Sequence, residues 1–264
     1  MLNAKQPLVS FQDVRLRFPN GCELFKGINL NIAENAFYFL TGPSGAGKST
    51  LLKMLYLDQL PTSGALHVFG KDVTRVNANQ AALLRRKIGV VFQDFRLIPH
   101  LTALENVSLP LKIKGMHDRK REREAVELLA WVGLKDHLHI TPPMMSGGQQ
   151  QRVGVARALA AQPDVILMDE PFGALDPVTR TELQEEFKRI QARLNLTVIM
   201  VTHDMTEALL MADRIAVMKA GEVLQIGTPY ELLNEPAHDY VREMIEMPRQ
   251  RADRLEKLLR QSAS

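Results

Sequence analysis

A glycine-rich stretch between two apolar runs restricts the fold more than any other feature of this chain. The run before it covers residues 37–41 and is rich in β-forming side chains, and the run after it covers residues 51–55. The stretch reads Gly42, Pro43, Ser44, Gly45, Ala46, Gly47, Lys48, Ser49 and Thr50. A strand, a glycine loop and a helix in this order match the G-x-x-x-x-G-K-S pattern, in which backbone N–H groups hold phosphates at the positive end of a helix. We expect Lys48 to reach the β- and γ-phosphates of a nucleotide and Ser49 to hold Mg²⁺.

The composition bounds the class of protein. With 264 residues, of which 45% are hydrophobic, the chain can bury a core of one large domain, or of one domain with an inserted lobe. Its net charge of +3, from 33 basic and 30 acidic residues, is too balanced to favour nucleic acid as the main partner. A single cysteine, Cys22, excludes an internal disulfide and indicates a reducing compartment. No apolar run approaches the roughly 18 residues that would cross a bilayer, and no signal peptide is evident, so we expect a soluble, cytoplasmic protein.

Alternating apolar and polar residues mark antiparallel strands at two places. Residues 8–32 alternate on both sides of a turn at Phe18–Gly21, and residues 214–227 are predicted to form a hairpin that turns at Ala220 and Gly221. Phe18, just before its turn, has two interpretations. Its ring either stacks on a flat ligand or belongs to the core.

Three further apolar runs are typical of buried parallel strands, and each is followed by polar side chains. They cover residues 87–93, 165–169 and 197–202, and they end at Gln93, at Asp169 and Glu170, and at His203. The carboxyl ends of parallel strands meet at one edge of a sheet, where α/β proteins bind ligands. Two carboxylates at such an edge are costly unless a cation lies beside them, and next to a phosphate loop that cation would be Mg²⁺.

The remaining segments are predicted to be largely helical. Residues 94–143 are interpreted as an inserted helical lobe, with Thr102 as an N-cap and a later helix whose apolar positions are Val126, Leu129 and Val132. Ser146 begins another helix, and Asp176 caps a third. Residues 249–260 are predicted to form a helix with Ala252, Leu255 and Leu259 on one face. That helix either packs on its own domain or docks on a partner or on anionic lipid.

The order of these motifs resembles the nucleotide-binding domain of ATP-binding cassette (ABC) proteins over nearly the whole chain. In that family, the position of Phe18 stacks on adenine, residues 42–49 are the Walker A loop, and Gln93 lies in the Q-loop. Residues 145–149 resemble the family signature, with Met145 where leucine is usual. The resemblance also assigns roles to four later positions. Asp169 matches the Walker B aspartate, Glu170 the catalytic glutamate, Asp176 the D-loop and His203 the switch histidine.

The resemblance implies a fold and an activity. The fold is α/β: a P-loop NTPase core with a mostly parallel sheet, an N-terminal antiparallel β subdomain and an inserted α-helical lobe. We expect residues 1–93 and 144–228 to form the ATP-binding core, 94–143 the lobe and 229–264 a C-terminal helical extension. The activity is ATP hydrolysis with Lys48, Gln93, Glu170 and His203 as catalytic groups, and Mg²⁺ on Ser49, Gln93 and Asp169. Two copies are expected to pair head to tail, so that Ser146, Gly148 and Gln149 of one face the ATP held by the other.

Different segments of the chain resemble two different groups within this family. The segments 53–57 and 92–97 are similar to cell-division ATPases of the FtsE type. The chain from Gly148 to the C-terminal helices is instead similar to ATPases of osmoprotectant importers of the glycine betaine type. Asp94 departs from the serine that is common in those importers. We favour the importer, in which the chain would sit on the inner face of the cell membrane through a permease. The alternative is a cell-division ATPase on an FtsX-like membrane subunit. A soluble ABC factor acting on nucleic acid or ribosomes is disfavoured, because the chain has one cassette and near-neutral charge.

Overall fold

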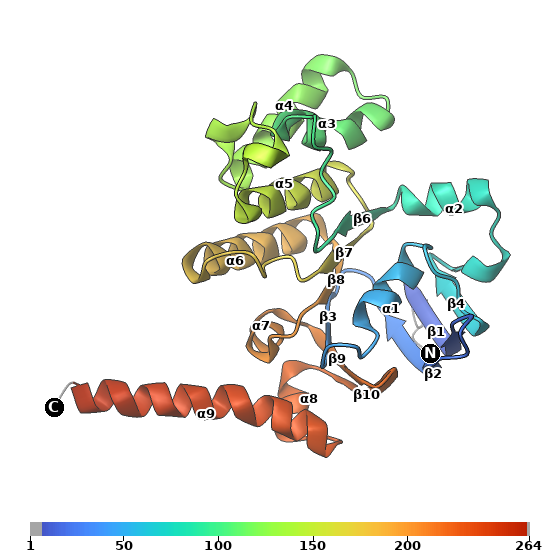
Figure 1. The fold of residues 1–264 in the computed structure, drawn as a ribbon, viewed down its shortest axis with the longest axis vertical. Coiled ribbons are helices and arrows are strands. Elements are labelled where there is room, and N and C mark those ends of the chain that lie inside the picture. The colour runs from blue at the N-terminus through green and yellow to red at the C-terminus, as the bar shows by residue number, and fades with distance from the viewer. Residues whose placement is uncertain (1–6, 263–264) are drawn as a thin grey trace, which may run out of the picture.

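A six-stranded sheet forms the centre of the molecule and carries the loops of the site (Figure 1). The computed structural model describes the backbone of residues 7–262, and their side chains except those of 251–252 and 255–262. The strand order is β10-β9-β3-β8-β7-β6, parallel from β9 to β6 and antiparallel between β9 and β10. The strands are β3 (Phe37–Thr41), β6 (Ile88–Val91), β7 (Val165–Asp169), β8 (Thr197–Val201), β9 (Arg214–Lys219) and β10 (Glu222–Gly227). Every residue of β3 and β8 is buried, as their unbroken apolar sequences predict.

A smaller antiparallel sheet covers part of the central sheet. Its order is β2-β1-β4-β5, from strands β1 (Val9–Arg17), β2 (Glu23–Ile32), β4 (Ser63–Val68) and β5 (Lys71–Asp72). The predicted turn closes β1 onto β2, because the Phe18 N–H donates to the Cys22 carbonyl at 2.8 Å and the Gly21 N–H to the Phe18 carbonyl at 2.9 Å. Helix α1 (Lys48–Leu55) packs with both sheets in one core cluster, which confirms the predicted antiparallel β subdomain.

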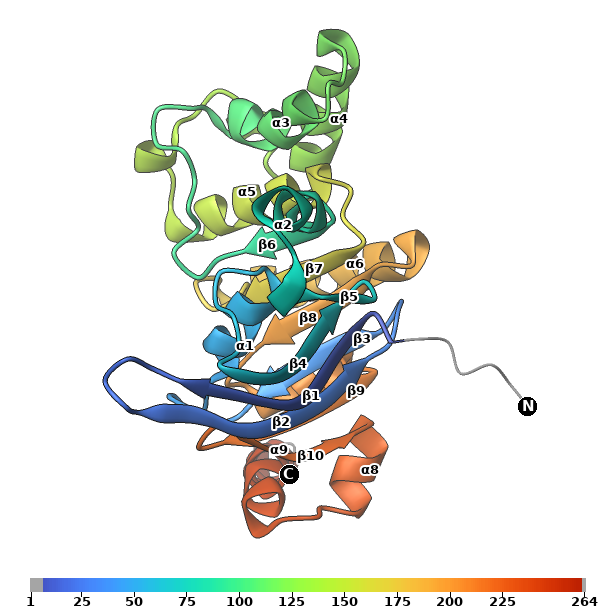
Figure 2. The same ribbon diagram turned by 90° about the vertical axis from the view of Figure 1, so that its right-hand side faces the viewer.

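A helical lobe lies at one end of the molecule (Figures 1 and 2). Its helices are α3 (Ala103–Ile113) and α4 (Asp118–Trp131), and α5 (Gly147–Ala160) packs against both of them. Thr102 caps α3 as predicted, with Glu105 completing a reciprocal pair of hydrogen bonds. The predicted apolar positions of α4 were wrong at Val126, which is only half-buried. Ala125 and Leu129, four residues apart, are the fully buried ones.

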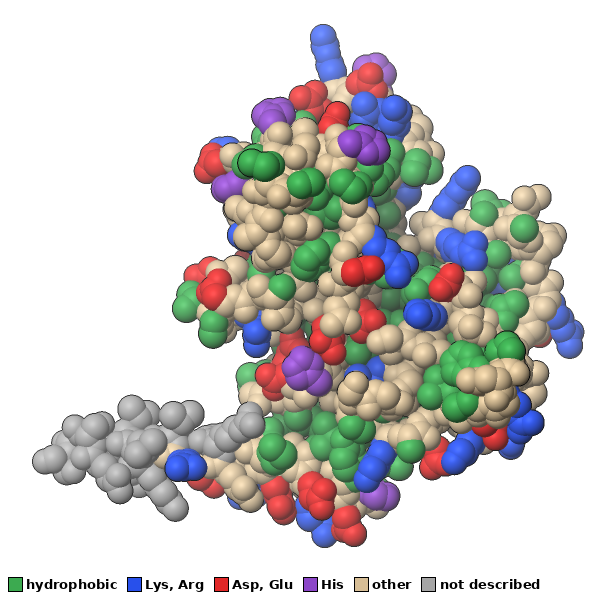
Figure 3. Space-filling view, in the orientation of Figure 1, with side chains coloured by type: hydrophobic (Ala, Val, Ile, Leu, Met, Phe, Trp, Pro, Cys, Tyr) green, Lys and Arg blue, Asp and Glu red, His purple; other side chains and the backbone are tan. Residues whose placement is uncertain are grey.

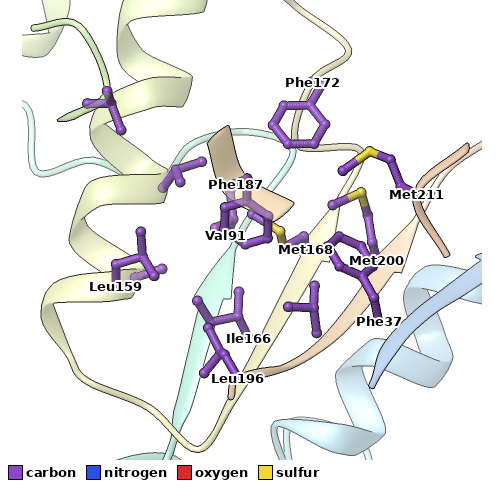
Figure 4. Packing of buried hydrophobic residues seen from close by; sticks show 14 of the residues in the cluster. Phe37, Val91, Leu159, Ile166, Met168, Phe172, Phe187, Leu196, Met200 and Met211 are labelled. Carbon is purple, nitrogen blue, oxygen red and sulfur yellow. The ribbon is translucent and has the colours of Figure 1, made fainter. Parts of the chain in front are cut away.

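The other face of the central sheet is covered by α5 and by two later helices, α6 (Pro177–Leu194) and α7 (Met205–Met211). Figure 4 shows this core at close range, with Phe37, Met168 and Met200 of the sheet beneath Phe172 and Phe187. Helix α2 (Ala78–Arg85) precedes β6. The strand was predicted over residues 87–93, but β6 ends at Val91, so Phe92 and Gln93 lie in the loop that follows it.

The chain closes with the predicted hairpin of β9 and β10, followed by α8 (Pro229–Asn234) and α9 (Asp239–Ser262). Val241 and Ile245 anchor α9 in the core. The helix then projects away from the body (Figure 1), and it confirms the helix predicted for residues 249–260. The side chains of Ala252, Leu255 and Leu259, which were predicted to share one face, lie outside the described ones.

Candidate nucleotide-binding site

Glycines shape the loop between β3 and α1 because the surrounding chain leaves no space for side chains. Gly42 and Gly47 have φ angles of 143° and 99°, in the region that favours glycine. A Cβ atom on Gly42 would lie 2.0 Å from the Met218 carbonyl oxygen, and one on Gly47 would lie 2.5 Å from a ring carbon of Phe25. The loop is therefore built against β9 and β2, and its conformation excludes any other residue at these two positions.

Lys48 begins α1 and is buried, with 7% of its surface exposed. Its Nζ donates to the carbonyl oxygens of Gly42 at 2.7 Å and Pro43 at 2.9 Å, so the ammonium lies over the loop. Burial lowers the pKa of Lys48, and the nearby carboxylates of Glu170 and Asp169 oppose that shift. The first turn of α1 contains no acidic residue. The loop, the ammonium and the helix end together make a site for an anion.

Two carboxylates follow β7 and differ in their surroundings. Burial raises the pKa of Asp169, and a side-chain hydrogen bond with Ser49 opposes the increase. Glu170 has a φ of 48°, unusual for a residue with a side chain, and its N–H donates to the Val201 carbonyl at 3.1 Å. Its Oε1 lies 3.3 Å from Nδ1 of His203, which follows β8. Strands β7 and β8 thus bring a carboxylate and an imidazole together above the phosphate loop.

One pocket collects most of the residues that the sequence predicted. It has a volume of about 480 Å³ and is lined by Phe18, Leu24, Ser44, Gly45, Ala46, Gly47, Lys48, Ser49, Thr50, Gln93, Glu170 and His203. Phe18 is half-buried and lines this pocket, while it also packs against the core cluster. A second pocket of about 390 Å³ shares Ser49 and Gln93 with the first and adds Asp169. Gly42 and Pro43 line neither pocket and instead supply the carbonyls that hold Lys48.

The predicted signature and D-loop residues lie outside both pockets and cap their own helices. Ser146 accepts a hydrogen bond from the Gln149 N–H at 3.2 Å, and the Gln149 side chain accepts one from the Ser146 N–H at 2.9 Å. Gly148 lies close to the segment before α6, because a Cβ there would be 3.0 Å from Leu175. Asp176 accepts from the Thr179 N–H at 3.0 Å. Within one chain, these residues do not approach Lys48.

Sequence reasoning missed two side chains of α5 that hold the loops of the site. Gln151 is buried and donates to the backbone carbonyl of Glu170 at 3.1 Å. Arg157 donates to the carbonyls of Phe95 at 2.9 Å and Arg96 at 2.7 Å, both of which have positive φ angles. Gln151 had a signal, since it occupies a buried face of the helix four residues before Val155. A polar residue at such a position requires a hydrogen-bond partner.

Comparison with known proteins agrees with this geometry. Residues 25–173 match a family model described as ABC transporter. The chain is 46% identical over 239 residues to the glycine betaine/carnitine/choline transport ATP-binding protein OpuCA of Bacillus subtilis, covering 90% of this chain and 62% of that protein. It is 44% identical over 218 residues to the glycine betaine/proline betaine transport ATP-binding protein ProV of Escherichia coli, covering 82% and 54%. The chain thus spans about three fifths of the length of these relatives.

Two further similarities cover more of the matched protein. The trimethylamine N-oxide transport ATP-binding protein TmoW of Pelagibacter ubique is 43% identical over 241 residues, covering 90% of this chain and 68% of TmoW. Among solved structures, a dimeric post-hydrolysis state of the ATP-binding cassette MJ0796, bound to ADP and phosphate, is similar with a TM-score of 0.79 and 38% identity. That match covers 84% of this chain and 98% of MJ0796.

Proposed function

Because the chain belongs to the ABC transporter family, we propose that it binds and hydrolyses ATP to drive a membrane transporter. The observation that carries the proposal is the pocket in which the phosphate loop, Gln93, Glu170 and His203 meet beside an aromatic ring. Phosphoryl transfer requires positioning and charge neutralisation more than covalent chemistry, and this set of side chains supplies both.

Phe18, the phosphate loop and Lys48 bind the ATP molecule. Phe18 stacks on the adenine base, while the loop amides and the start of α1 hold the phosphates. Lys48 moves from the loop carbonyls to the β- and γ-phosphates. This exchange is favourable because the phosphates carry a full negative charge and the carbonyls only a partial one.

Mg²⁺ fits the oxygen donors at the sheet edge. The Ser49 hydroxyl, the Gln93 amide oxygen and the Asp169 carboxylate line one pocket, and hard oxygen ligands of this kind suit Mg²⁺. No cluster of three His, Cys, Asp or Glu ligands occurs in the part of the chain that the structure describes. A shared site, in which the phosphates complete the coordination, is typical of Mg²⁺ and neutralises charge on them.

Glu170 and His203 act on the reacting atoms. The Glu170 carboxylate orients and polarises the attacking water, whose oxygen bonds to the γ-phosphorus as the bond to the ADP oxygen breaks. His203 contacts the γ-phosphate, and its position 3.3 Å from Glu170 places both side chains on the same side of the pocket.

A second copy completes the site. Ser146 is exposed and Gly148 and Gln149 are half-buried at the start of α5, where the positive end of the helix favours an anion. In a head-to-tail pair they would meet the γ-phosphate held by the partner's loop, and Asp176 would lie at the contact between the copies. The dimeric MJ0796 cassette supports such a pair.

The helical lobe transmits the pairing and separation of the two copies to a membrane partner. We assign residues 1–93 and 144–228 to the ATP-binding core, 94–143 to the lobe that contacts a permease, and 229–264 to a C-terminal extension. Among the described residues, no helix combines the length and apolar character that crossing a bilayer requires. The relatives' names, which are those of transport ATP-binding proteins, support a position on the inner membrane face through that partner.

The transported solute is a quaternary amine of the osmoprotectant class. The names of OpuCA, ProV and TmoW support an importer of betaine-like compounds over the cell-division role that the segment 92–97 also suggested. Solute specificity itself would reside in other chains of the transporter.

Purified protein tests the hydrolytic role. Glu170→Gln should still bind ATP and form ATP-dependent dimers by size-exclusion chromatography, while its turnover falls about a hundredfold or more because the water is no longer activated. Wild-type turnover in this variant would remove Glu170 from its role.

Growth of the source cell tests the transported class. A deletion strain should lose rescue by betaine at high osmolarity while cell length stays normal, and the wild-type chain should restore rescue. Filamentous cells with intact betaine rescue would overturn the importer and support the cell-division alternative.

A further inference from the structure

Thr202, the residue before His203, is held by several hydrogen bonds. Thr202 is buried, with 3% of its surface exposed, and its N–H donates to the Leu40 carbonyl at 3.2 Å. Its hydroxyl accepts a hydrogen bond from the Asp204 N–H at 3.0 Å. One hydroxyl therefore contacts the residue that follows His203, while its own backbone is fixed to β3. This arrangement restricts the backbone on both sides of the imidazole.

Glu207 of α7 accepts the remaining hydrogen bond of that hydroxyl. Oγ1 of Thr202 donates to Oε2 of Glu207, and the amide of Gln184 donates to the other carboxylate oxygen at 2.7 Å. Gln184 lies on α6, two turns after the D-loop residue Asp176. Arg180 of the same helix holds the Leu175 carbonyl at 3.1 Å, and its charge acts on Glu207. The carboxylate thus joins α6, α7 and the end of β8.

Capping of α7 does not explain why the side chain of Glu207 is partly buried. Asp204 already caps this helix, because its Oδ1 accepts from the N–H groups of Thr206 at 2.8 Å and Glu207 at 3.3 Å. The side chain of Glu207 instead accepts hydrogen bonds from the side chains of Thr202 and Gln184. A partly buried carboxylate is costly, and two strong donors offset that cost only while the three elements keep this arrangement.

We propose that Glu207, acting through the Thr202 hydroxyl, is a positioning residue that holds His203 against the γ-phosphate and links it to α6. The inference rests on the proposed ATP hydrolysis. His203 is exposed and no other described side chain than Glu170 pairs with it, so its position depends on the backbone that carries it. The link to α6 makes that position respond to the D-loop, which precedes α6 directly.

Isosteric substitutions test the role of the hydroxyl. Thr202→Val removes only the hydroxyl and should lower kcat about tenfold, because small misplacements of a group at the reacting atoms are costly, while KM changes less than about twofold. Thr202→Ser should restore at least half of the wild-type kcat. Thr197→Val is the matched control: its hydroxyl is equally buried in β8 and accepts from the Asn35 N–H at 2.9 Å, but it lies at the far end of the strand.

A merely structural role predicts that both valine variants lose thermal stability and neither loses kcat. Equal kcat values in Thr202→Val and Thr197→Val would overturn the inference. So would a Thr202→Ser variant that is as slow as Thr202→Val.

A double-mutant cycle tests whether the effect passes through His203. In a His203→Ala background, assayed with radiolabelled ATP at high protein concentration, Thr202→Val should lower the residual rate less than about twofold. Glu207→Ala should match Thr202→Val and add little to it. A further tenfold loss in the His203→Ala background would show that the hydroxyl acts elsewhere. If wild-type protein hydrolyses ATP and Glu170→Gln does not, such a result refutes only this inference.

Discussion

Phe18 lines two pockets. One is the pocket that contains Lys48, and the other has a volume of about 510 Å³ and is also lined by Arg15, Arg17 and Thr62. Its half-buried ring packs at the edge of the core cluster and also lines both pockets. Phe18→Ala should raise KM for ATP roughly fivefold or more, the loss expected for one base stacked on an aromatic ring, with kcat within about twofold. Steady-state kinetics give both values. Phe69→Ala, at a pocket on the opposite edge of the sheet, is the control and should leave KM unchanged. A fall in kcat with unchanged KM would favour the core role for Phe18.

Glu207 should also make stability depend on pH. Burial raises its pKa above the ordinary 4.5, so the folded chain binds this proton more tightly than the unfolded chain does. The contribution to stability is fully present below pH 4.5 and is lost as pH rises through the folded pKa. Glu207→Gln removes this dependence. The Tm of Glu207→Gln minus the Tm of the wild type should therefore increase as the pH is raised from about 4 to about 7.

Glu105 provides a control of opposite sign for that measurement. Hydrogen bonds from Thr102 lower the pKa of Glu105, so its contribution is present above the ordinary value and is lost as pH falls through the folded pKa. Glu105→Gln should accordingly lose Tm relative to wild type as pH rises. If the two variants shifted in the same direction, the assignment of Glu207 would be wrong.

At the scale of elements, α5 connects the lobe to the Q-loop. The carbonyls that Arg157 holds belong to Phe95 and Arg96, whose positive φ angles cost energy for residues with side chains. Arg157→Met should therefore release this segment, and hydrogen exchange at residues 93–97 should become faster. Arg152→Met is the matched control, because Arg152 lies on the same helix but holds the Val132 carbonyl instead. Equal exchange in both variants would contradict the role of Arg157.

The sequence predicts those features that depend on neighbouring residues better than those that depend on contacts between distant residues. The phosphate loop and the polar ends of β7 and β8 follow from local patterns, and the structure brings them into one pocket. The buried face of α4 was missed by one residue because Ala125 is small and gives little hydrophobic signal. The bonds of Gln151 to Glu170 and of Gln184 to Glu207 join residues 19 and 23 positions apart. Helix periodicity can indicate that such a side chain is buried, but only tertiary packing determines which residue it bonds.

At the scale of the whole molecule, α9 is anchored by its first turns. Val241 and Ile245 are buried in the core, and both precede Pro248. Truncation after Pro248 should therefore change Tm by only a few degrees and leave ATP hydrolysis unchanged, whereas truncation after Asn234 removes both anchors and should lower Tm by about 5 °C or more. Differential scanning calorimetry distinguishes the two. Loss of membrane-partner assembly already on truncation after Pro248 would instead indicate docking by residues 249–264.

The separation of Ser146, Gly148 and Gln149 from the pocket of Lys48 has a kinetic consequence for the proposed pairing. If the signature of one copy must meet the phosphate loop of another, the encounter of two copies becomes the slow step in dilute solution. Specific activity should then climb with protein concentration and level off once most chains are paired. If two copies assemble on a membrane partner as proposed, they are held at a high effective concentration, and turnover should no longer depend on the total amount of protein in the cell.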